Sequence, residues 1–170
     1  MKPLRSHVAI AIDGGGLKGV IPARALAMLE EYLGKPCGAV FRVAAGTSTG
    51  SIISAGIAAG LTARELHGLY LELGATIFRR SWRTALFPLT RYRYPAEPLA
   101  RALRQHLGDL SMGDLWQGHD RIDVVITAFD LVENRTRFIK PWKAEYADWP
   151  LVQAVMASST VPTMFPVVAG

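Results

Sequence analysis

The chain has 170 residues, of which 50% are hydrophobic and 19% are charged, and its formal net charge is +5. This length suits one domain with a buried core, and the composition excludes a disordered or low-complexity chain. Cys37 is the only cysteine, which excludes an intrachain disulfide and gives no sign of a disulfide-stapled secreted domain. We therefore expect a single domain over residues 1–170.

The N-terminus superficially resembles a secretory leader, because Lys2 and Arg5 precede an apolar run. That run ends at Asp13, which is too early for a signal peptide. The longest weakly polar stretch, residues 43–61, is rich in Gly, Ser and Thr and is not typical of a membrane span. We expect a cytoplasmic protein, whose positive charge favours anionic partners and allows peripheral contact with an anionic membrane surface.

Apolar spacing predicts strands and helices in alternation along the chain. Strands are expected at residues 7–12, 40–45, 121–130 and 136–140, the last two joined as a hairpin. Helices are expected at residues 20–33, 51–60, 62–73, 99–107 and 149–157, with Thr62 opening a capping box and Asp148 capping the last helix. This alternation favours an α/β fold with a mostly parallel sheet covered by helices on both faces.

Residues 79–98 combine five arginines with aromatic residues and prolines, and we interpret them as a loop. One interpretation is a solvated loop with a few packed aromatic side chains. The other is a flap that covers the active site and meets an anionic membrane, with arginines at the headgroups and Trp82 at the interface. A nucleic-acid patch has a similar composition, but nothing else in the sequence supports it, and we expect no nucleic-acid partner.

A glycine-rich turn, Gly14-Gly15-Gly16-Leu17-Lys18-Gly19, follows the first predicted strand. Its spacing matches the G-x-G-x-x-G fingerprint of dinucleotide-binding proteins, but the second strand ends without the carboxylate that would bind a ribose. A phosphate-binding P-loop is excluded because Val20 follows Gly19. Dinucleotide binding therefore stays the weaker alternative, and we expect no cofactor.

A second motif, Gly46-Thr47-Ser48-Thr49-Gly50, lies between the second predicted strand and a helix. This G-x-S-x-G pattern in that context is typical of a nucleophile elbow. In a parallel sheet both turns lie at the carboxyl edge, where ligands bind. We expect amides of the glycine loop to face the oxyanion that forms when Ser48 attacks a carbonyl carbon.

Together these two motifs resemble the patatin-like phospholipase family. Residues 157–159, followed by Val161-Pro162 and Phe165-Pro166, are similar to the helix end that precedes the last catalytic strand of that family. The resemblance implies a three-layer α/β/α fold, lipid acyl hydrolase activity through a Ser–Asp dyad, and no metal. It implies Ser48 as the nucleophile and Lys18 at a basic position. The candidate oxyanion-hole residues are Gly14, Gly15, Gly16, Leu17, Lys18 and Gly19, and the candidate elbow residues are Gly46, Thr47, Thr49 and Gly50.

The family carries its catalytic aspartate in an Asp-Gly-Gly/Ala motif, and no such motif follows Pro166 here. We therefore expect a domain that is incomplete at its C-terminus; the alternative is a catalytically impaired fragment or pseudoenzyme that binds lipid or a protein partner. A triad of Ser48 with His119 and Asp109 or Asp114 is less favoured. Asp130 is interpreted as a turn residue first and as a substitute base second.

Overall fold

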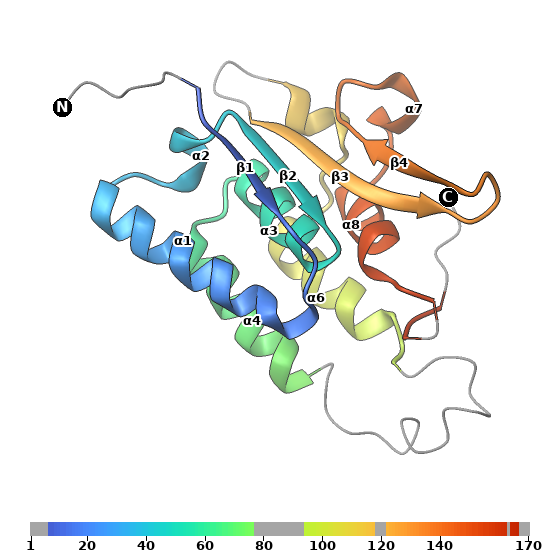
Figure 1. The fold of residues 1–170 in the computed structure, drawn as a ribbon, viewed down its shortest axis with the longest axis horizontal. Coiled ribbons are helices and arrows are strands. Elements are labelled where there is room, and N and C mark those ends of the chain that lie inside the picture. Colours follow the sequence, from blue (N-terminus) through green and yellow to red (C-terminus); the bar gives the residue numbers. More distant parts are fainter. Residues whose placement is uncertain (1–6, 77–93, 118–121, 163, 167–170) are drawn as a thin grey trace.

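The computed structural model describes residues 7–76, 94–117, 122–162 and 164–166, and in them four strands form one sheet. The strands are β1 (Ala9–Ile12), β2 (Val43–Thr47), β3 (Asp123–Asp130) and β4 (Arg135–Ile139). They follow the order β1-β2-β3-β4 across the sheet. The first three strands are parallel, and β4 returns antiparallel to β3 as a hairpin (Figure 1). The carboxyl ends of β1 and β2 therefore lie at the same edge.

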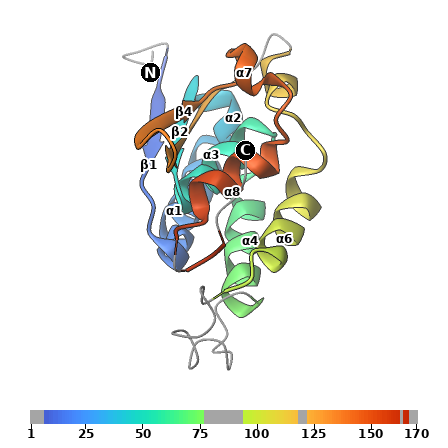
Figure 2. The ribbon, with the colours of Figure 1, turned by 90° about the vertical axis from the view of Figure 1, so that its right-hand side faces the viewer.

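Helices connect and flank these strands. They are α1 (Val20–Leu33), α2 (Cys37–Val40), α3 (Thr49–Ala58), α4 (Ala63–Thr76), α6 (Glu97–Leu107), α7 (Ala144–Ala147) and α8 (Leu151–Ser159), with the 3-10 turns η1 (Gly16–Gly19) and η2 (Gly113–Trp116). Helices α3 and α8 pack on the sheet, and α4 and α6 lie beyond them (Figure 2). The predicted α/β class and the mostly parallel sheet are confirmed. Among the described residues, however, no helix layer covers the second face of the sheet, which the sequence predicted to be covered.

Helix α3 is the centre of the core and sets the position of the turn that precedes it. Its residues 50–57 are all buried, and Ile52, Ile53 and Ile57 are at most 1% exposed. A helix that is buried on every side needs no polar face, and its sequence TGSIISAGIA has none with charge. Because α3 contacts β1, β2 and β3, its first turn is fixed against the carboxyl edge of the sheet.

The opposite face of the sheet carries small and apolar residues that the described helices leave accessible. Ala11 is exposed, and its neighbours in register, Ala45 and Val125, are half-buried. Phe138 on β4 is 53% exposed. Within the described ranges, the helices are too short or too polar to cross a bilayer.

The sequence predicted several element boundaries correctly. Helix α1 spans the expected residues 20–33 and ends at Gly34, whose φ of 63° is the left-handed cap that glycine allows. The capping box is confirmed: the Thr62 N–H donates to Glu65 Oε2 at 2.8 Å, and the Glu65 N–H donates to Thr62 Oγ1 at 3.2 Å.

Other boundary predictions were wrong. Val40 ends the short helix α2, so the second strand begins only at Val43. Asp148 does not cap α8, which begins at Leu151 with Pro150 in the capping position. A residue that precedes proline is disfavoured in the helical region, which keeps Trp149 out of the helix.

One carboxylate joins three helices. Glu30 on α1 accepts the N–H of Cys37 at the start of α2 at 2.7 Å and the N–H of Ala63 at the start of α4 at 2.9 Å. Cys37 is fully buried beside this carboxylate. Desolvation, reinforced by the Glu30 charge and its hydrogen bond, raises the pKa of the Cys37 thiol from 9.0 to about 12.

This raised pKa predicts that Cys37 stays a neutral, unreactive thiol in the folded chain. Because the folded-state pKa lies above the unfolded one, the thiol stabilises the fold below about pH 9 and loses that contribution as the pH rises toward 12. Alkylation by iodoacetamide near pH 9, followed by mass spectrometry, should be at least about tenfold slower in the native chain than in urea. Equal rates would contradict this environment for Cys37.

Candidate functional site

Ser48 lies on a sharp turn between β2 and α3. Its backbone has φ 53° and ψ −123°, a left-handed conformation that costs a non-glycine residue roughly 1–3 kcal/mol. The glycines of the motif explain why the turn can be this tight. A Cβ at Gly46 would overlap the backbone of Gly50, and a Cβ at Gly50 would overlap the carbonyl of Ile12 on β1. The sequence thus places a strained serine at the amino end of a buried helix.

Hydroxyl groups from two helices hold the Ser48 backbone in this conformation. The Ser48 N–H donates to Ser158 Oγ at 2.8 Å. The Ser48 carbonyl accepts the Ser51 hydroxyl at 2.5 Å, the Ser51 N–H at 2.9 Å and the Ser159 hydroxyl at 3.1 Å. Among the described residues no side chain is hydrogen-bonded to Ser48 Oγ, which is left to face the neighbouring loop.

The glycine loop that follows β1 contacts Ser48 directly. A Cβ built on Gly14 would lie 2.8 Å from Ser48 Cβ and 3.6 Å from Ser48 Oγ, so only glycine permits this approach. The loop then turns at Gly16, whose φ is +58°, into η1. The structure therefore brings together the two predicted motifs.

The two motifs are also joined by a hydrogen bond. The Gly15 N–H donates to Thr49 Oγ1 at 3.0 Å, which commits one loop amide to the elbow. Gly19, the last residue of the loop, packs its Cα against the ring of Tyr70 on α4. The Tyr70 hydroxyl donates to the Thr49 carbonyl, and burial raises the pKa of Tyr70, which keeps this donor protonated. Motif spacing gave no sign of Tyr70, because it comes from a helix outside both motifs.

A small cavity of about 160 Å³ opens beside Ser48. Leu17 from the glycine loop and Ser159 from α8 reach its wall, and most of the remaining lining is apolar: Ile52, Tyr70, Leu73, Leu99, Met164 and Phe165. An engineered cavity of about this volume in another protein stays dry and binds benzene. The space next to Ser48 is thus suited to an apolar group of modest size.

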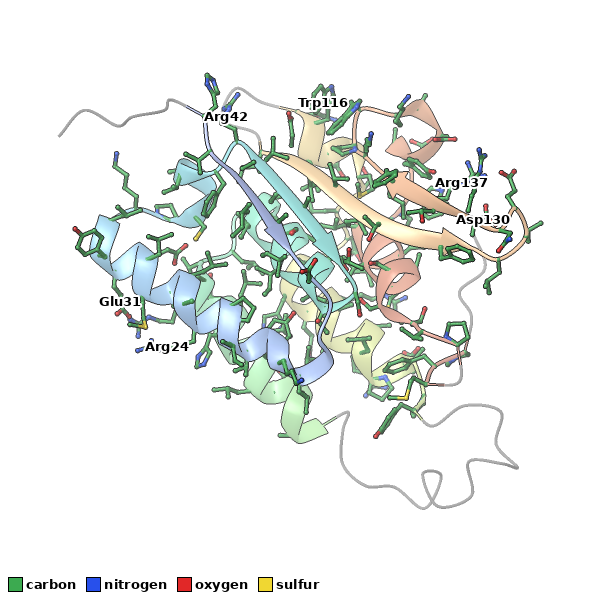
Figure 3. The ribbon with its side chains drawn as sticks, viewed as in Figure 1. Arg24, Glu31, Arg42, Trp116, Asp130 and Arg137 are labelled. Carbon is green, nitrogen blue, oxygen red and sulfur yellow. The ribbon has the colours of Figure 1, made fainter. Side chains whose placement is uncertain are left out.

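Other predicted site residues lie apart from Ser48 or outside the described residues. Asp130 accepts the N–H groups of Val132 and Glu133 and pairs with the Arg137 guanidinium at 3.1 Å, at the turn end of the hairpin (Figure 3). The backbone hydrogen bond from Glu133 is the largest cause that lowers the Asp130 pKa, which makes this carboxylate a poor base. Its interpretation as a turn residue is confirmed.

His119 and most of the predicted arginine-rich loop lie outside the described residues. Lys18 lies in η1, where its backbone N–H donates to the Gly15 carbonyl at 3.2 Å. Thr47 is the last residue of β2, and its Oγ1 lies 2.7 Å from Thr127 Oγ1 on β3. Across the described part of the chain, no three His, Cys, Asp or Glu side chains converge where they could hold a metal ion.

Known proteins are similar to this chain in sequence and in fold. The model of the patatin-like phospholipase family matches residues 10–169. A cGAMP-activated phospholipase of Pseudomonas aeruginosa is 28% identical over 172 residues, which cover 98% of this chain and 50% of that protein. Patatin-like protein 1 of Oryza sativa subsp. indica is 33% identical over 178 residues, which cover 92% of this chain and 41% of that protein.

A similar fold occurs in the crystal structure of VipD from Legionella pneumophila. It matches with a TM-score of 0.63 at 13% identity, over 95% of this chain and 44% of VipD. The chain thus spans half or less of the length of the relatives it matches. The family match covers nearly all of its residues and includes both motifs that meet at Ser48, so the chain belongs to the patatin-like phospholipase family.

Proposed function

We propose that this chain carries the acyl-transfer site of a serine-dependent lipid acyl hydrolase of the phospholipase A or esterase type. The observation that carries the proposal is the contact between Gly14 and Ser48, which places the hydroxyl of a strained elbow against an amide-rich loop. The relatives named phospholipase support a hydrolase that acts on lipids.

The proposed reaction begins when Ser48 Oγ attacks the carbonyl carbon of an ester. A C–O bond forms, the carbonyl oxygen becomes an oxyanion, and the Ser48 proton passes to a base. Amides of the glycine loop and the first turn of α3 would stabilise that oxyanion. Loss of the alcohol or lysolipid leaves an acyl-serine, and water then releases the fatty acid. The apolar cavity beside Ser48 would hold the acyl group.

The base in this proposal is an aspartate, as the family resemblance implies, and it is not among the described residues. Without a base in hydrogen-bond reach, a serine hydroxyl keeps its ordinary high pKa and reacts slowly. The assay therefore needs this chain and any longer polypeptide that the same reading frame encodes.

The first prediction concerns the nucleophile. Ser48→Ala should reduce hydrolysis of p-nitrophenyl butyrate to the background rate, because the acyl-serine can no longer form. Initial rates, measured by absorbance for purified protein and the variant, test this. The control is Ser111→Ala, because the Ser111 hydroxyl donates to Asp114 at the start of η2 and not to Ser48. Equal rates for Ser48→Ala and the unmodified protein, in a preparation that turns over substrate, would eliminate Ser48 as the nucleophile.

The second prediction concerns the glycine loop. In Gly14→Ala the new methyl would press on Ser48 Cβ, so either the loop or the elbow must shift. We expect the rate to fall by about tenfold to a hundredfold, as is typical of small displacements at a reacting centre. Gly68→Ala is the matched control, because a Cβ at Gly68 on α4 meets no described atom within 4 Å. A Gly14→Ala rate like that of the control would remove the loop from the mechanism.

The second candidate function is a non-catalytic chain that binds lipid or a protein partner. It is favoured by the lack, among the described residues, of a carboxylate or imidazole bonded to Ser48 Oγ. This alternative predicts co-sedimentation with vesicles that contain anionic lipid, without release of fatty acid. Fatty acid release that depends on Ser48 would exclude it.

A further inference from the structure

The two backbone polar groups of Ser48, its N–H and its carbonyl, have different numbers of hydrogen-bond partners. The carbonyl has three described donors: the Ser51 N–H, the Ser51 hydroxyl and the Ser159 hydroxyl. The N–H has one described acceptor, Ser158 Oγ, at 2.8 Å. A carbonyl oxygen has two lone pairs, so three donors saturate it and the loss of one is tolerated. The N–H loses its only described acceptor if the Ser158 hydroxyl is removed.

The position of Ser48 explains why its N–H depends on a side chain. The strand β2 ends at Thr47, so Ser48 lies one residue beyond the last parallel pair of the ladder, Thr47 with Thr127. The positive φ of Ser48 turns the residues that follow it out of the strand direction and into the first turn of α3. A partly buried donor that loses its acceptor costs more than an average hydrogen bond contributes. The strained conformation persists only if its surroundings hold it.

Ser158 is well placed to supply that constraint. It lies in the last turn of α8, and the neighbouring residues Val155, Met156 and Ser159 are buried. Helix α8 packs against both α3 and β3, so the Ser158 hydroxyl is positioned by a packed helix and not by a loop. Two adjacent serines therefore hydrogen-bond to the backbone of Ser48: Ser158 accepts its N–H, and Ser159 donates to its carbonyl.

We propose that Ser158 is a positioning residue of the proposed hydrolase: by accepting the Ser48 N–H, its hydroxyl holds the elbow in the conformation that aims Ser48 Oγ at the glycine loop. The inference rests on the proposed function, because the orientation of Ser48 matters for rate only if Ser48 reacts. The proposal also predicts an order of effects: removal of the Ser158 hydroxyl should lower kcat more than removal of the Ser159 or Ser51 hydroxyl.

The test compares two substitutions of nearly equal shape. Ser158→Thr keeps the acceptor oxygen, and Ser158→Val replaces it with a methyl group. We expect Ser158→Val to lower kcat for p-nitrophenyl butyrate by about tenfold or more with KM within about twofold, and Ser158→Thr to retain most of kcat. Ser159→Ala should lower kcat less than Ser158→Val does. Ser54→Ala is the control, because Ser54 is a buried serine on α3 whose hydroxyl has no partner among the described residues.

A second readout needs no turnover. Hydrogen exchange of the Ser48 amide, followed by NMR, should be slow in the unmodified chain and in Ser158→Thr, and faster in Ser158→Val, while amides of α3 stay protected. Unchanged exchange in Ser158→Val, a kcat like that of the unmodified protein, or an equal loss of kcat in both variants would each overturn the proposal. If Ser48→Ala retains full activity, the proposed function fails, and the exchange measurement still decides whether Ser158 holds the elbow.

Discussion

The contact between the backbone at Gly14 and the side chain of Ser48 is the constraint on which the rest of the site depends. It exists because β1 and β2 are parallel neighbours, so the turns that leave them emerge at the same edge of the sheet. A side chain at residue 14 would push the two turns apart. The loop can therefore face the serine only with glycine at this position.

The surrounding helices hold Ser48 and the glycine loop in fixed positions relative to each other. Helix α3 is buried along its length and cannot move its first turn without disturbing the core. Tyr70 packs on the end of the glycine loop and donates to the elbow, and α8 supplies Ser158 and Ser159 from a third direction. Strain at Ser48 is thus sustained by polar contacts that come from elements far apart in the sequence.

Much of this architecture could be predicted from the sequence, because it depends on local signals. The spacing of apolar residues, together with Gly34, predicted where α1 begins and ends. The two glycine motifs predicted that the site lies at the carboxyl edge of β1 and β2. Tyr70 and the small apolar cavity could not be predicted, since contacts between α4, α6 and the elbow are set by tertiary packing. The start of α8 was missed because Pro150 outweighs the capping tendency of Asp148.

The central claim is that Ser48 Oγ and the glycine loop act on one reacting carbonyl group. A crystal structure after reaction with an alkyl fluorophosphonate tests this directly, in this chain or in a longer polypeptide from the same reading frame. We expect phosphorus bonded to Ser48 Oγ, with one phosphonyl oxygen about 2.7–3.1 Å from the amide nitrogen of Gly14, Gly16 or Leu17. An adduct on another residue, or a phosphonyl oxygen directed away from that loop, would contradict the account.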